Sequence, residues 1–70
     1  MTSGDVINAR ARAGARMVEA RAALARAAGL RASAPLLYEG MAEVARLAEE
    51  EHEAWGIVER AEARRRKRTP

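Results

Sequence analysis

Glu49 and His52 are the residues whose types and spacing come closest to a metal-binding motif. A Glu-x-x-His spacing places a carboxylate and an imidazole one turn apart on a helix, and helical bundles hold iron or manganese with such pairs. Glu19 is the candidate for a further carboxylate from an earlier helix. At about 100° per residue, however, Glu49 and Glu19 both point away from the apolar stripes of their helices. We therefore favour a solvated glutamate run with His52 at its edge, and a carboxylate and histidine metal-binding bundle is the alternative.

Glu51 occupies a position where the helical periodicity predicts a buried apolar residue. A buried carboxylate is costly unless a cation pairs with it. If the chain folds back near residue 32, facing positions have numbers that sum to roughly 65, which places Glu51 near Gly14 and Trp55 near Arg10. We predict a polar cluster of Arg10, Glu51 and Trp55, in which the guanidinium binds the carboxylate and lies on the indole. Its expected role is to fix register and oligomeric state, and a catalytic or ligand-binding role is the alternative.

Five consecutive basic residues lie near the end of the sequence, namely Arg64, Arg65, Arg66, Lys67 and Arg68. Such a run can neutralise phosphates and bind nucleic acid without reading its sequence. It can equally be a favourable helix end, because positive charge in the last turn opposes the helix dipole. No aromatic residue accompanies the run, so base stacking is not expected. A nucleic-acid-binding accessory protein would combine this run with the arginines of the first half, which are Arg10, Arg12, Arg16, Arg21 and Arg26.

No motif in the sequence indicates an enzyme. The chain has no cysteine, which excludes disulfides, thiolate zinc sites and cysteine nucleophiles. Its serines are Ser3 and Ser33, both suited to helix caps, so a Ser-His-acid arrangement is not credible. No glycine-rich phosphate loop is present either. We predict a non-enzymatic chain without a cofactor.

The elements that position these residues are predicted to be two helices. Alanine, arginine and glutamate dominate the composition, which favours an all-α fold. Helix one should span about 4–29 and end at a left-handed Gly29. Ser33 is a suitable N-cap and Pro35 a suitable first-turn residue for helix two, which should span about 34–66. Because the connector is short, we expect an antiparallel hairpin over residues 1–63, followed by a basic tail over residues 64–70.

Both helices carry an apolar stripe, and helix one carries two. Two stripes on one helix imply two helical neighbours, and a lone hairpin supplies one. The sequence therefore predicts a homodimer in which two hairpins form a four-helix bundle. The stripe of helix two consists of Leu37, Met41, Val44, Leu47, Ala48, Trp55 and Val58. In helix one the first stripe is Val6, Ala13, Met17, Ala20, Leu24 and Ala28, and the second is Ile7, Ala11, Gly14, Val18, Ala22 and Ala25.

Size and charge agree with self-association. A chain of 70 residues buries only about 60% of its unfolded surface when it folds alone. Residues 1–35 have a formal charge of +4, residues 36–63 of −6, and residues 64–68 of +5, so a basic helix can lie against an acidic one. We expect a cytoplasmic protein without membrane contact, because there is no secretory signal and no apolar run of about 18 residues. The expected function is a small helical interaction or assembly module.

Overall fold

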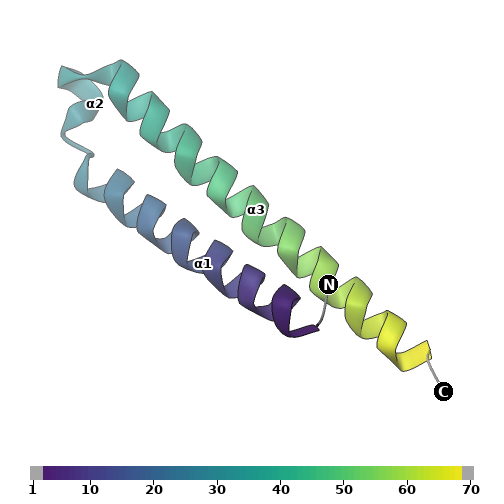
Figure 1. The fold of residues 1–70 in the computed structure, drawn as a ribbon. Coiled ribbons are helices and arrows are strands. Elements are labelled where there is room, and N and C mark those ends of the chain that lie inside the picture. The colour runs from purple at the N-terminus through teal and green to yellow at the C-terminus, as the bar shows by residue number, and fades with distance from the viewer. Residues whose placement is uncertain (1–2, 69–70) are drawn as a thin grey trace.

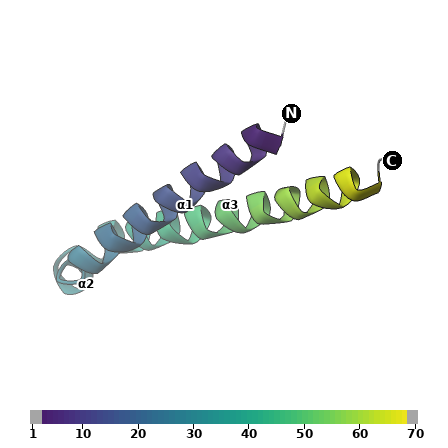
Figure 2. The same ribbon diagram turned by 90° about the horizontal axis from the view of Figure 1, so that it is seen from below.

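The computed structural model describes residues 3–68, which form three helices: α1 (Ser3–Arg26), α2 (Leu30–Ser33) and α3 (Pro35–Arg68). The all-α prediction is confirmed. From the corner at α2, α3 runs back alongside α1 in the opposite direction (Figures 1 and 2). The molecule measures 60 × 14 × 13 Å, and its radius of gyration is 16.3 Å. A compact chain of this length would have a radius of gyration of about 11 Å, so the fold is a single elongated layer.

Helix α1 ends at Arg26, three residues earlier than predicted. Gly29 does not adopt a left-handed conformation: its φ and ψ are −64° and −21°, and no described residue has a positive φ. The chain instead passes through a tight turn over residues 27–29, in which the Leu30 N–H donates to the Ala27 carbonyl at 2.8 Å. This turn leads into the short helix α2, which the residue pattern did not predict.

The break between α2 and α3 lies at Ala34. Its φ of −143° and ψ of 68° interrupt the helical path, because a proline disfavours the α conformation of the residue before it. Pro35 begins α3, as predicted, and the Ala34 carbonyl accepts the Tyr38 N–H at 3.0 Å. Ser33 is not the N-cap of α3. It belongs to α2, where its hydroxyl donates a long hydrogen bond of 3.5 Å to the Gly29 carbonyl.

The contact between α1 and α3 is made by small residues. The buried apolar side chains of the described residues are Val6, Ala9, Ala13 and Ala45, and Gly56 is also buried. Small side chains allow two helix backbones to approach closely. We call these five residues the internal contact. On α1 it includes Val6 and Ala13 of the first predicted stripe and also Ala9, which the prediction left out. Of the other stripe residues Met17, Ala20 and Leu24 are half-buried, whereas Ala28 beyond the helix end is exposed.

On α3 the predicted stripe is not the face that meets α1. Leu37, Val44 and Leu47 are each more than half exposed, and Val58 is exposed as well. The centre of the stripe lies about 90° round the helix from Ala45. The reason is that Ala45 and Gly56 let α3 approach α1 more closely than leucine and valine would. The large apolar side chains are therefore left at the side of the helix pair.

Candidate interaction surface

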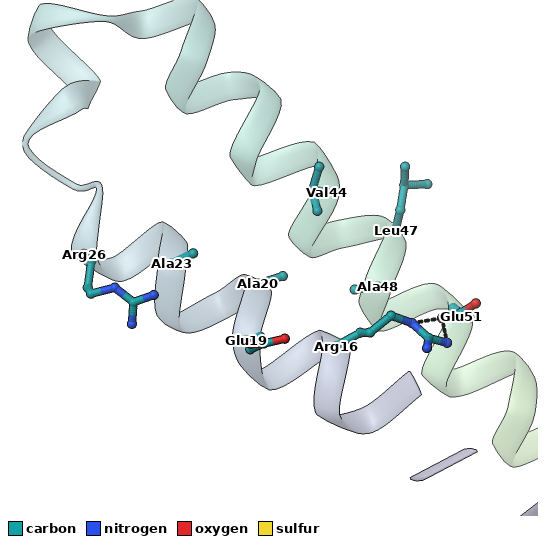
Figure 3. Close-up of a pocket in the computed structure, with 9 residues that line it drawn as sticks. All are labelled: Arg16, Glu19, Ala20, Ala23, Arg26, Val44, Leu47, Ala48 and Glu51. Atoms are coloured by element: carbon teal, nitrogen blue, oxygen red, sulfur yellow. Dashed lines mark hydrogen bonds and ion pairs between the residues drawn. The ribbon is translucent and has the colours of Figure 1, made fainter. Parts of the chain in front are cut away.

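An apolar groove runs along one side of the helix pair, between α1 and α3. It consists of two adjoining cavities of about 570 and 380 Å³ that share Ala20, Ala23 and Val44. The two alanines of α1 turn toward α3 and form the floor (Figure 3). The wall comes from α3 and comprises Leu36, Leu37, Gly40, Met41, Val44, Leu47 and Ala48. The α1 side of the groove thus presents small apolar side chains, and the α3 side presents mostly large ones.

Both signs of charge border this groove. Arg16 and Glu51 close it toward the N-terminal half of α1, with the Arg16 Nη2 2.6 Å from the Glu51 Oε1 (Figure 3). Glu19 and Arg26 stand on the α1 side of the same cavity. The four charged residues that line the groove therefore cancel formally, and the surface combines an apolar wall with an electrically balanced border.

The whole chain exposes more surface than a compact protein of its size. Its accessible surface is 5299 Å², whereas a compact monomer of 7.6 kDa is expected to expose about 4300 Å². The excess of about 1000 Å² resembles the roughly 800 Å² that each partner buries in a standard protein interface. The single chain therefore leaves uncovered about as much area as one partner would cover.

The second predicted stripe of α1 is a smaller apolar surface on a different face. Val18 is 63% exposed, and Ile7, Ala11, Ala22 and Ala25 are exposed as well. Helical phase places Val18 about 140° or more from the groove alanines. Gly14 does not belong to this exposed surface, because a Cβ at this position would lie 3.3 Å from the His52 ring. The larger exposed apolar surface belongs to α3, not to α1.

The predicted cluster of Arg10, Glu51 and Trp55 is not formed as an ion-paired unit. Arg10 instead donates from Nη1 to the Glu59 Oε2 at 3.1 Å. Glu51, predicted to be buried, has a 45% exposed side chain and pairs with Arg16. Trp55 is half-buried. The structure therefore gives each of the two charged residues a different partner.

The predicted register of α1 against α3 agrees with the structure to within about one residue, because Gly14 lies beside His52 and Gly56 beside the Arg10 side chain. Cross-helix ion pairs join Arg10 to Glu59, Arg16 to Glu51 and Arg21 to Glu49. Their α3 partners lie two to five residues further along than the predicted sum places them. The long arginine side chains reach along α3 beyond the residues that they lie beside, as Arg10 does when it passes Gly56 to pair with Glu59. Rotation of α3 onto Ala45 moves Glu51 from the predicted core to the edge of the groove.

Glu49 and His52 are not arranged as metal ligands with a third residue. Among residues 3–68, no group of three or more histidine or acidic side chains could hold a metal ion. The Glu49 carboxylate pairs with Arg21, and the His52 ring lies against Gly14. Glu19 lines the groove instead.

A second charge network lies within α3. Arg46 bonds to Glu43 and to Glu50, with 2.6 Å between Nη1 and the Glu50 Oε1. The hydrogen bond from Arg46 lowers the pKa of the Glu43 carboxyl. Pairs at this spacing support a helix locally, so this network stabilises the exposed face of α3.

The basic run forms the end of α3. The helix continues to Arg68, slightly beyond the predicted end, whereas Thr69 and Pro70 of the predicted tail lie outside the described residues. Residues 64–67 are exposed. Of the five α1 arginines in the nucleic-acid alternative, Arg10, Arg16 and Arg21 pair with glutamates of α3. The pairing leaves the helix end as the concentrated positive surface.

No helix within residues 3–68 is long and apolar enough to cross a membrane. Comparison with protein-family models, with curated proteins and with solved structures finds no match to this chain. The functional proposal therefore rests on the groove, on the charges at its border and on the exposed area.

Proposed function

We propose that this chain is a non-enzymatic helical hairpin that acts as an interaction and assembly module by binding a second copy of itself. The grooves of the two copies face each other, and the resulting homodimer is a four-helix bundle. The observation that carries the proposal is the α3 wall, where Leu37, Val44 and Leu47 are each at least 51% exposed. Side chains of this size normally supply the core of a helical protein.

The internal contact alone is a poor core. Of its buried side chains three are alanines, and Val6 is the one larger residue. A small domain without disulfides or metals usually needs association to reach adequate stability. Covering the groove would bury the leucine and valine side chains, at roughly 25 cal/mol per Å² of apolar surface. Association is therefore expected to stabilise the helices themselves.

The charges around the groove favour a second copy as the occupant. In a two-fold dimer the same patch meets itself, so a patch of one sign would repel its copy. Here Arg16 and Arg26 are balanced by Glu19 and Glu51. A strongly charged peptide would gain little from such a border, whereas a second copy brings an apolar wall and a neutral border of the same kind.

Light scattering of the eluting protein over a range of concentrations tests the proposal. We expect a mass of twice 7.6 kDa at high concentration and dissociation on dilution. We also expect the melting temperature to rise with protein concentration, because a partner that binds only the folded chain stabilises it by mass action. A mass of 7.6 kDa at every concentration, with a constant melting temperature, would overturn the proposal.

A matched pair of variants identifies the face. Leu47→Glu places a charge on the groove wall, and Val18→Glu places the same charge on the exposed stripe of α1. We expect Leu47→Glu to be monomeric and less helical at concentrations where the parent chain is dimeric, since a buried unpaired charge is costly. Val18→Glu should remain dimeric. If Val18→Glu dissociates the dimer and Leu47→Glu does not, the groove is the wrong face.

A further inference from the structure

The last turn of α3 extends past the start of α1. Ala63 is half-buried, whereas residues 64–67 are exposed. In both ribbon views the end of α3 lies beyond the first residue of α1 (Figures 1 and 2). We call residues 64–68 the basic overhang. No other helix of the described residues lies beside it, so the side chains of residues 64–67 are accessible from several directions.

The net positive charge of the chain resides in this overhang. The chain carries a formal charge of +3, and residues 64–68 carry +5, which leaves −2 for the remainder. Arg10, Arg16 and Arg21 add little positive field along α1 because glutamates of α3 lie against them. At the overhang, the Glu62 carboxylate lies 3.6 Å from the Arg65 guanidinium and partly offsets one of the five charges. Five charges thus lie within about 6 Å of helix rise at one end of an otherwise slightly acidic molecule.

We propose that the basic overhang binds the backbone phosphates of duplex DNA without sequence preference. Four of its five residues are arginines, whose planar guanidinium forms two parallel hydrogen bonds to a phosphate. Successive residues about 100° apart distribute these groups around the helix. A helix about 10–12 Å wide fits the major groove of B-DNA, about 12 Å wide, where phosphates flank it on both sides.

Charge distribution and groove geometry favour this ligand over other polyanions. A helix that lies on an anionic membrane needs an apolar face, and residues 64–68 contain no apolar residue. The major groove of duplex RNA is too narrow and deep for side chains to read. The proposal does not depend on self-association, because the overhang contains no residue that lines the groove.

Fluorescence anisotropy with a labelled 20-base-pair duplex DNA of mixed sequence tests the site. If all five charges displace counterions, the logarithm of the binding constant falls with the logarithm of salt concentration with a slope of about −4.5. That slope corresponds to a roughly 500-fold loss of affinity between 50 and 200 mM salt. Absence of binding at 50 mM salt would overturn the proposal.

The variant Arg64→Gln/Arg66→Gln removes two charges from the overhang. Its matched control, Arg12→Gln/Arg31→Gln, removes two exposed arginines elsewhere. We expect the slope to become shallower by about 1.8 in the first variant and to stay within about 0.5 of the parent value in the control. Equal slopes in the two variants would show that the binding surface is not the overhang.

Two competing probes complete the test. Duplex RNA of the same sequence and phosphatidylserine vesicles should each bind at least tenfold more weakly than the duplex DNA at equal salt. Equal or tighter binding to either probe would overturn the assignment to DNA. Light scattering and circular dichroism of both variants distinguish this result from a failure of the proposed dimer, because neither variant alters the groove.

Discussion

The internal contact and the groove use opposite kinds of apolar residue. Apart from Val6, the internal contact consists of alanine and glycine, whereas leucine, valine and methionine of α3 form most of the wall of the open groove beside it. Small residues bring helix backbones close together but remove little apolar surface from water. Large residues keep helix backbones further apart but remove more apolar surface from water when they are buried. The comparison indicates that the internal contact sets the geometry of the helix pair. Burial of the groove would provide most of the further stabilisation that the helix pair can gain.

The largest expected effect comes from enlarging a side chain within the internal contact. Ala13 is 0% exposed, so Ala13→Leu must separate the helices. We expect a loss of about 3 kcal/mol in the free energy of unfolding, measured by urea denaturation at fixed protein concentration. Ala25→Leu is the control, because Ala25 is an exposed alanine of the same helix. Similar losses in both variants would contradict a closely packed internal contact.

Shortening a side chain of the groove should have the next largest effect. In the proposed dimer Leu47→Ala removes apolar surface from the interface, and we expect a loss of about 2 kcal/mol per protomer. Sedimentation equilibrium should show correspondingly weaker association. Ile57→Ala is the control because Ile57 is 58% exposed and lies outside the groove. Its expected change is within about 0.5 kcal/mol. Equal losses would remove the distinction between groove and open surface.

Two glycines sharpen the comparison between the packed helix pair and the corner. At Gly29 a Cβ would meet nothing within 4 Å, and the backbone is right-handed helical. Gly29→Ala should therefore raise the free energy of unfolding by about 0.4–1 kcal/mol. Gly14→Ala should gain less, since its methyl group would press on His52 at 3.3 Å. Thermal melts of both variants measure the difference, and destabilisation by Gly29→Ala would contradict the observed corner.

The smallest expected effect belongs to the ion pair at the groove border. Arg16 and Glu51 have side chains that are 51% and 45% exposed, so water screens their attraction. Arg16→Gln should cost about 0.5 kcal/mol at low salt, and less at 1 M salt where screening is strong. Arg12→Gln serves as the control without this partner. A cost above about 2 kcal/mol would show that the pair is desolvated in the assembled protein.

The sequence was sufficient for the helical class, the start of α3 at Pro35 and two of the three α1 residues at the internal contact, Val6 and Ala13. These features follow from local propensity, from the conformational restriction of proline and from helical periodicity. Val6 and Ala13 lie on one apolar face of α1, and this face can be read from the sequence without knowing which helix packs against it. Such features depend on one element at a time, and a single sequence records them well.

The phase of α3 was not predictable in the same way. Leucine and valine mark an apolar face but do not say whether the same chain or another copy covers it. Ala45 and Gly56 determine which face of α3 packs on α1, because small residues allow the two backbones to approach more closely. Glu51 then moved with the helix to the groove edge. A search for aligned alanine and glycine positions on both helices would have indicated the internal contact.

The elongated, one-layer shape has a measurable consequence for small-angle X-ray scattering. The largest dimension, 60 Å, is more than four times either of the other two, so it dominates the radius of gyration. A second copy that stacks on the groove along this length makes the particle thicker but hardly longer. Forward scattering should then double on association while the Guinier slope steepens only slightly, which separates face-to-face stacking from end-to-end joining without any substitution.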